Sequence, residues 1–369
     1  IDKNYDYSFG GTGNETLVLG SAQTGYSNAN VVWETTQQIN AGIDLGLFSN
    51  KFTLGLDFYE SNKKNMLFPM VIPPINGAGS SATVVLNAGN MRNRGVELTL
   101  GHRNRVGKVN YNVNMTFSKN ENKVTEMGGA SNMYYFSDGK PVTTGSSDLV
   151  TVIKEGYEAG AFFVMPTDGI INTEQKLVEY QKLKSNARMG DLIYVDRNGD
   201  GKISDDDRVY GGSGMPECEV GLNMGASYNG FDFSMNWYAS IGNEIINGSK
   251  IYAYQSHTHK DLIYQWSYVN PTSMIPTYKG SSHDNYRAYA DRWVEDGSFV
   301  RLKNIILGYS LPKKAIMRIG LNKCRFYLAA DNLLTLTKYT GYDPEVGSNG
   351  LSKRGLDLGT YPISVPMRG

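Results

Sequence analysis

Residues 108–118 read KVNYNVNMTFS and alternate strictly between two kinds of side chain. Every second residue is apolar, and the residues between them carry amides or hydroxyls. The apolar members are Val109, Tyr111, Val113, Met115 and Phe117. A period of two places the two kinds of side chain on opposite faces of an extended chain. The stretch is therefore predicted to be a β-strand with one apolar and one polar face.

The same alternation recurs in seven further stretches. They lie at residues 39–47, 52–58, 96–100, 218–228, 231–239, 299–311 and 326–330. Their second face carries Asn, Ser, Thr, Asp and Gly, which suits a water-filled lumen better than the outside of a soluble sheet, where Lys and Glu would be common. A soluble β-sandwich would also alternate, so this pattern alone leaves both architectures open. The sequence predicts an all-β fold with eight antiparallel strands.

Composition narrows the class of protein. No apolar run approaches the roughly 18 residues that a membrane helix needs, so any membrane crossing would be made by strands. Lys+Arg and Asp+Glu balance at 36 each, which argues against a nucleic-acid partner. The chain has no GxSxG, HExxH or phosphate-loop pattern, so an enzyme is not expected. No signal peptide stands at Ile1, so the sequence begins either at a mature terminus or partway through a longer protein.

The lengths of the connections between these strands indicate how the sheet is oriented. Tight turns are expected at residues 47–52, 104–107 and 229–230, and a helical turn or two at 312–322. Long segments alternate with them, at residues 61–93, 119–217 and 241–297. All long loops then lie at one end of the sheet, as in outer-membrane barrels. Because the strands before and after it are antiparallel, the segment 119–217 must contribute zero or an even number of strands to the sheet. Thr151–Lys154 is a candidate for one of them.

Three motifs carry a resemblance to a known family. The first begins at Asp291 with DRWVEDGSFVRLKNIILGYSLPKK and continues through RFYLAADNLLTLTKYTGYDPEV to KRGLD. The second is NAGNMRNRGVELTL at residues 87–100, and the third is GDLIYVDRNGDGKISDDDRVYGG at residues 190–212. In these motifs, and in their order, the chain is similar to SusC/RagA-type, TonB-dependent outer-membrane transporters from Trp33 onward.

The resemblance implies an architecture larger than this chain. Transporters of this kind have a transmembrane antiparallel barrel of about 22 strands around a folded plug, with long extracellular loops. Residues 1–369 would form the C-terminal part of the barrel domain, with the plug and the early strands upstream of Ile1. The chain would then need the N-terminal remainder of the barrel as a partner, and outer-membrane lipid would cover its apolar face.

The resemblance also implies a function, nutrient uptake across the outer membrane of a Bacteroidetes-type envelope. Oligosaccharides or peptides would be the cargo, a SusD-like surface lipoprotein would close the external mouth, and TonB would act on the plug. Two alternatives remain open from the sequence. One is a passive porin or self-contained barrel without a plug. The other is a soluble calcium-binding β-rich adhesin of the cell surface.

Residues 196–207, DRNGDGKISDDD, have the spacing of a calcium-binding loop. Asp196, Asn198 and Asp200 occupy positions one, three and five, Lys202 would offer its carbonyl at seven, and Asp207 stands at twelve. Calcium prefers such a ring of oxygen ligands. Position twelve departs from the standard loop, which has a longer Glu there. The alternative is an Asp/Asn/Gly-rich turn whose side chains cap its own backbone.

Aromatic side chains concentrate in the segment 252–268. They are Tyr252, Tyr254, Tyr264, Trp266 and Tyr268. Sugar rings stack on such side chains, so this segment is the predicted contact with cargo or with a lid protein. The alternative is that the rings pack the loops against one another or form the aromatic girdle of a barrel.

Overall fold

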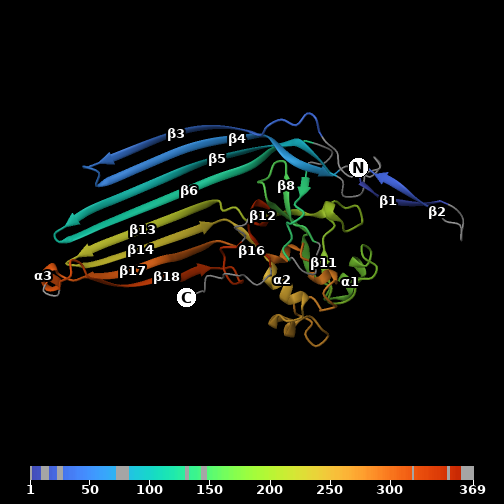
Figure 1. Cartoon of the computed structure of the whole chain (residues 1–369). Coiled ribbons are helices and arrows are strands. Elements are labelled where there is room, and N and C mark those ends of the chain that lie inside the picture. The colour runs from blue at the N-terminus through green and yellow to red at the C-terminus, as the bar shows by residue number, and fades with distance from the viewer. Residues whose placement is uncertain are drawn as a thin grey trace.

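An eight-stranded antiparallel sheet dominates the computed structural model (Figure 1), which describes residues 2–9, 16–22, 28–71, 83–128, 133–142, 148–317, 320–346 and 350–358. The strand order is β18–β17–β14–β13–β6–β5–β4–β3. In chain order the strands are β3 (Thr35–Leu47), β4 (Phe52–Val71), β5 (Thr83–Val106), β6 (Val109–Met127), β13 (Cys218–Tyr228), β14 (Phe231–Ile241), β17 (Phe299–Ser310) and β18 (Arg325–Thr337). They correspond one to one to the eight stretches predicted from the alternation, which confirms that prediction.

The register of the ladder turns the alternation of single strands into two continuous faces. One row of paired residues crosses six strands as Gly101, Asn114, Asn223, Asn236, Asn304 and Asp331. The adjacent row on the opposite face is His102, Val113, Met224, Met235, Ile305 and Ala330. The sheet therefore has one polar face and one largely apolar face.

The apolar face has no protein layer over it in the described part of the chain. Ile39 and Leu328 are each 77% exposed, and Phe58 is 54% exposed. An apolar surface of this extent calls for an apolar cover, which a lipid bilayer supplies. No helix among the described residues is long and apolar enough to cross a membrane.

Short turns join the strands at one end of the sheet, as predicted. Asn229 (φ 47°) and Gly230 (φ 87°) form the two-residue turn between β13 and β14, and both lie in the left-handed region that such hairpins require. Gly107 (φ 60°) opens the turn between β5 and β6. The β17–β18 connection holds one helical turn, α3 (Lys313–Ile316).

Residues 61–93 differ from the prediction. They were expected to form a loop, yet β4 continues to Val71 and β5 begins at Thr83, so most of this segment is a paired extension of the hairpin. Likewise β6 continues to Met127. These outer parts pack against the long connections, as at Met66 (6% exposed), so there the ladder persists while the period-two pattern does not.

The long connections fold into a separate body at the other end of the sheet (Figure 1), which we call the loop cap and define as the described residues of 133–217, 242–298 and 338–358. It contains three small sheets, of order β12–β9–β8–β7, β16–β15–β19 and β10–β11. Their strands are β7 (Met133–Tyr135), β8 (Thr151–Lys154), β9 (Ala161–Val164), β10 (Thr167–Ile170), β11 (Leu192–Tyr194), β12 (Val209–Ser213), β15 (Glu244–Asn247), β16 (Val294–Asp296) and β19 (Leu356–Asp357). Thr151–Lys154 is thus a strand, and none of these strands joins the large sheet.

Two helices and several 3-10 turns complete the loop cap. They are α1 (Glu174–Tyr180), α2 (Gly248–Gln255), η2 (Asp205–Asp207), η3 (Lys260–Tyr264), η4 (Asp284–Tyr286), η5 (Asp291–Trp293) and η7 (Leu351–Lys353). A further hairpin, β1 (Asp2–Phe9) with β2 (Thr16–Ala22), lies at the start of the chain.

The main hydrophobic core lies in the loop cap and not in the sheet. Its fully buried members include Phe162 from the second long connection, Tyr254, Tyr286 and Trp293 from the third, and Leu356 from the segment after β18. Because all these segments contribute to one core, the long loops form a single folded unit.

Candidate functional site

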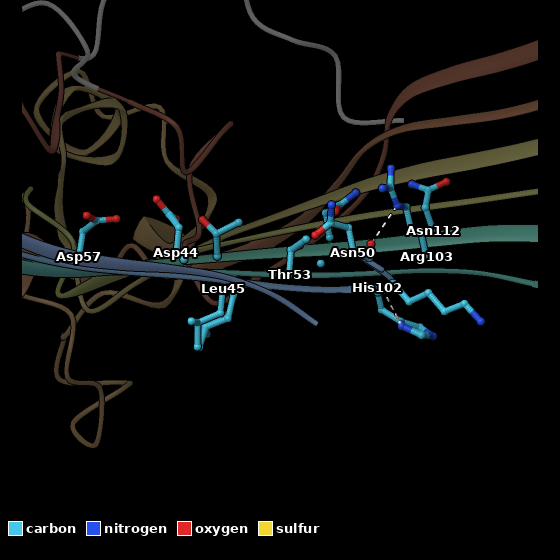
Figure 2. A pocket seen from close by; sticks show the side chains of 15 residues that line it. Asp44, Leu45, Asn50, Thr53, Asp57, His102, Arg103 and Asn112 are labelled. Atoms are coloured by element: carbon cyan, nitrogen blue, oxygen red, sulfur yellow. Dashed lines mark hydrogen bonds between the residues drawn. The ribbon is translucent and has the colours of Figure 1, made fainter. Parts of the chain in front are cut away.

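The polar face of the sheet is hollowed near the short turns (Figure 2), in a cavity of about 770 Å³ between β3, β4, β5 and β6. Asp44, Asp57, Arg103 and Asn112 point to this side, whereas Leu45 and His102 point to the other. A Cβ at Gly42 would lie 2.0 Å from Asp57 Oδ1. The absence of a side chain at Gly42 therefore leaves space on this face of the sheet for the carboxylate of Asp57.

A second cavity, of about 760 Å³, lies on the same face where the sheet meets the loop cap. Glu219, Tyr238 and Phe299 line it from β13, β14 and β17, and Pro344 and Leu351 from the segment that follows β18. The Tyr238 hydroxyl donates a hydrogen bond to Glu219 Oε1. An aromatic ring and a carboxylate thus face a cavity whose lining is partly polar and partly apolar, which can hold a ligand that offers both kinds of surface.

The described residues of 343–354 cover this cavity, and we call them the roof segment. Arg301 of β17 holds the roof segment in place. Arg301 is 1% exposed, and its guanidinium donates to Asp343 Oδ1 at 2.8 Å and to Glu345 Oε2 at 2.5 Å. The third contact is from Nε to Thr335 Oγ1 of β18, at 2.9 Å. A buried cation with this many acceptors fixes the backbone that carries the acceptors.

A β-bulge lets a second cation reach the same carboxylate. Leu302 pairs with Trp237, and Asn304 pairs with Asn236, so Lys303 is an extra residue in β17. Lys303 Nζ lies 2.6 Å from Glu345 Oε1. Such bulges redirect side chains locally.

The other end of the roof segment contacts another part of the loop cap. Ser352 Oγ donates to Asp138 Oδ2 at 3.1 Å, and Lys353 Nζ lies 3.6 Å from the same oxygen. The roof segment therefore connects the sheet to the Asp138 region of the loop cap over the cavity.

The sequence motifs did not single out this site. Arg301 stands inside FVRLKNIILGYS, a stretch assigned as a strand by its alternation, and Glu219 stands in another such strand. A charged side chain among the amides and hydroxyls of a strand's polar face is the signal that could have found both.

The predicted calcium loop lies in the loop cap and is stabilised by its own side chains. Asp196 accepts hydrogen bonds from Gly199 N at 2.7 Å and Gly201 N at 2.9 Å. Asn198 Oδ1 accepts from Asp200 N, and Asp200 Oδ1 accepts from Lys202 N, both at 2.9 Å. This is the self-capping pattern of the alternative interpretation.

Asp207 is the buried anchor of the same loop. Its carboxylate accepts from Arg197 N (2.8 Å), Asn198 N (3.2 Å) and Ser204 N (2.8 Å). Burial opposes its ionisation, but these three donors outweigh burial and hold the pKa below the ordinary value of 3.8. Among the described residues no group of three or more Asp, Glu, His or Cys side chains converges on a metal position. Calcium binding by this loop stays a prediction.

The predicted aromatic contact segment divides into two sets. Tyr254 (2% exposed) and Trp266 (4%) belong to the core of the loop cap, so the prediction that they contact cargo or a lid protein is corrected for these two. Tyr252 (45%), Tyr264 (65%) and Tyr268 (81%) remain exposed. Tyr254 and Trp266 pack with other buried aromatic side chains of the loop cap, so they are not available for contact with a ligand.

Known proteins resemble this chain in both sequence and fold. The family model described as "TonB dependent receptor-like, beta-barrel" matches residues 3–146. TonB-dependent receptor P3 of Formosa agariphila is 30% identical over 96% of this chain and 37% of its own length. TonB-dependent receptor SusC of Bacteroides thetaiotaomicron is 28% identical over 92% of this chain and 32% of its own length. The chain therefore spans about a third of the relatives it matches.

Solved structures share the fold. The RagAB peptide importer in its open-open state superposes with a TM-score of 0.67 at 25% identity, over 92% of this chain and 35% of that one. The RagAB peptide transporter gives 0.69 at 24% identity, over 97% and 37%. With its polar and apolar faces and its capped end, the chain is a section of the wall of a membrane-spanning β-barrel. It matches the TonB-dependent receptor barrel model over residues 3–146, is similar to the SusC and RagA transporters, and is part of an outer-membrane protein.

Proposed function

We propose that the chain forms part of the wall and outer cap of a TonB-dependent transporter that brings a nutrient across the outer membrane. The observation that carries this proposal is the polar face of the sheet, on which both the cavity under the roof segment and the hollow near the short turns lie. Cargo released below the loop cap would meet hydroxyl, amide and carboxylate side chains along this face. No step of such transport requires covalent chemistry by the chain.

The cargo class is an oligosaccharide or a peptide. Peptide is supported by the RagAB structures, which are described as a peptide transporter and importer. Oligosaccharide is supported by the pairing of Tyr238 with Glu219, because a sugar can stack on the ring and donate hydroxyl hydrogen bonds to the carboxylate.

The partners follow from the family. A SusD-like lipoprotein would close the outer mouth, and TonB would act through a plug carried by the remainder of the protein. The exposed tip of the loop cap is the best surface for the lid or the cargo. It holds Ile263 (81% exposed), Tyr264, Tyr268, Val269 (95%) and Met274 (63%). Exposed rings and aliphatic side chains gathered at one place are typical of contact surfaces.

We further propose that the loop 196–207 binds calcium and thereby stiffens the loop cap. Support comes from the spacing of Asp196, Asn198 and Asp200 and from the position of the loop, which is outside the membrane sector. The role is structural, because the loop contributes no side chain to either cavity.

Uptake by the whole polypeptide that carries this sequence tests the transporter proposal. Cells expressing it are given a labelled oligosaccharide and a labelled peptide pool, with and without a protonophore. A TonB-dependent transporter loses uptake when the proton gradient is removed, whereas a porin keeps it. A polypeptide that needs no detergent for solubility would instead favour the soluble adhesin.

A matched pair of variants tests the site. Glu219→Gln removes the carboxylate of the cavity, and Glu97→Gln removes a polar-face carboxylate of β5 that lines neither cavity. We expect lower uptake for the first variant only, at equal amounts of protein in the outer membrane. Equal uptake by both variants would remove this cavity from the transport path.

A further inference from the structure

The short turns of the sheet carry a charge pattern that the proposed function does not use. Residues 48–51, 103–109, 229–230 and 311–324 contain eight Lys or Arg and no Asp or Glu. The whole chain is balanced at 36 of each sign, so the other 28 basic residues share the rest of the chain with all 36 acidic ones. The turn end of the sheet is therefore strongly basic in a chain without net charge.

The basic side chains that the structure describes at this end are exposed and have no carboxylate within ion-pair distance among the described residues, although Asp232 acts on Lys323 over a longer distance. They are Lys51, Arg103, Arg105, Lys108, Lys313 and Lys323. Arg103 Nε donates to Asn50 O and Arg105 Nε to Gly107 O, each at 3.0 Å, so both bond only to turn carbonyls. The nearby Asp232 is already paired with Arg325 at 2.5 Å. These charges are available to a ligand.

An aromatic row places this basic end at a bilayer surface. One row of directly paired residues crosses β13, β14, β17 and β18 at the ends near the short turns. It consists of Tyr228, Phe231, Tyr309 and Phe326. The rings of Phe231 and Tyr309 lie 4.5 Å apart. Rows of aromatic side chains at strand ends mark the boundary between hydrocarbon and headgroups. The turns beyond the row therefore lie at headgroup level.

The β17–β18 connection adds apolar side chains to the charges. Met317 is 69% exposed and Leu321 is 45% exposed, between the exposed Lys313 and Lys323. Apolar side chains flanked by cations suit the boundary of an anionic membrane, where the former enter the acyl region and the latter contact phosphates. A soluble acidic partner would not account for the exposed apolar side chains.

We propose that the turn end of this sheet, centred on the β17–β18 connection, binds the headgroups of anionic phospholipids in the leaflet on the side of the short turns. Ammonium and guanidinium groups spread over three turns contact several phosphates at once, while the aromatic row and Met317 anchor the same edge in hydrocarbon. This interaction fixes the depth of the sheet in the bilayer, and it requires only that the sheet spans a membrane.

The test uses the whole polypeptide in nanodiscs and in detergent. Native mass spectrometry counts retained phosphatidylglycerol against phosphatidylcholine, for wild type and for a variant with Lys51, Lys108, Lys313 and Lys323 changed to Gln. A control variant carries the same change at four lysines of the opposite end, Lys123, Lys182, Lys260 and Lys338. Each basic residue near an anionic surface contributes about fivefold in affinity.

The expected result is a wild-type preference for phosphatidylglycerol that the control keeps and the turn variant loses, by at least tenfold. The proposal is overturned if wild type shows no preference, or if both variants keep it. It is also overturned if the turn variant keeps its lipid preference but is no longer retained on a polyglutamate column, because that outcome assigns the basic surface to an acidic protein. A second variant, Met317→Ser, is expected to weaken lipid retention without changing the charge.

Discussion

Replacement of Arg301 by Met is expected to release the roof segment from the sheet. The substitution leaves Asp343, which is 7% exposed, as a buried carboxylate without its cation, and it frees Glu345 from one of its two partners. Removing one member of a buried ion pair costs about 3–5 kcal/mol. Lys303→Met is the matched control, because Lys303 contacts the same Glu345 from the same strand with a side chain that is 29% exposed. A half-exposed pair contributes about 0–1 kcal/mol.

These free energies predict that the roof segment opens more often in the Arg301 variant than in the Lys303 variant. The Arg301 variant should open about 100-fold to 5000-fold more often than wild type, and the Lys303 variant no more than about fivefold. Hydrogen exchange at the backbone amide of Glu345 reports this opening, because that amide donates to Asp343 Oδ1 at 2.8 Å in the closed state. The measurement is made on the whole polypeptide in detergent. Equal exchange rates in the two variants would refute the view that the buried guanidinium holds the roof.

Four further predictions concern the membrane face, the loop tip and the calcium loop. Ile305→Arg on the apolar face should lower the free energy of unfolding by about 2–4 kcal/mol, and Ile306→Arg on the polar face by much less, as measured by urea unfolding in lipid vesicles. Tyr268→Ala should weaken capture of a lid protein or cargo at least tenfold in a pull-down without changing the melting temperature, and wild-type capture would contradict the tip assignment. Calcium titration by calorimetry should show a dissociation constant of about 10⁻⁴–10⁻³ M that Asp196→Asn weakens, and an absence of heat at millimolar calcium would leave the self-capped turn. Because the folded pKa of Asp207 lies below 3.8, its contribution to stability is present above that pH and disappears as pH falls through the lowered pKa, so exchange in the loop should accelerate only in that acidic range.

The strands were predictable because lipid and water impose opposite demands on neighbouring residues. Residues 108–118 alternate strictly, and β6 contains residues 109–118 of this stretch with both faces as expected. The outer parts of β4 and β5 were not predictable in the same way, because residues such as Met66 (6% exposed) contact the loop cap instead of lipid. Where the environment changes along a strand, the periodic signal ends before the hydrogen bonding does.

The loop cap shows where sequence reasoning could not decide. Tyr254 and Tyr264 stand in the same aromatic segment, yet one is buried in the core and the other is 65% exposed. Their difference depends on which residues of distant connections reach them, for example Trp293, whose ring lies 5.3 Å from that of Tyr254. Such contacts join parts of the chain with no shared periodicity, so no local pattern encodes them.

The bulge at Lys303 has a consequence for how the length of this protein can change during evolution. In a strand that separates two solvents, the insertion or deletion of one residue exchanges the faces of every residue on one side of the change. Without the extra residue, either the Arg301 end or the Ile305 end of β17 would present the wrong side chains to lipid. Changes of length in the membrane sector must therefore come in pairs, or be absorbed by a bulge such as this one. The connections within the loop cap have no such restriction and can lengthen one residue at a time.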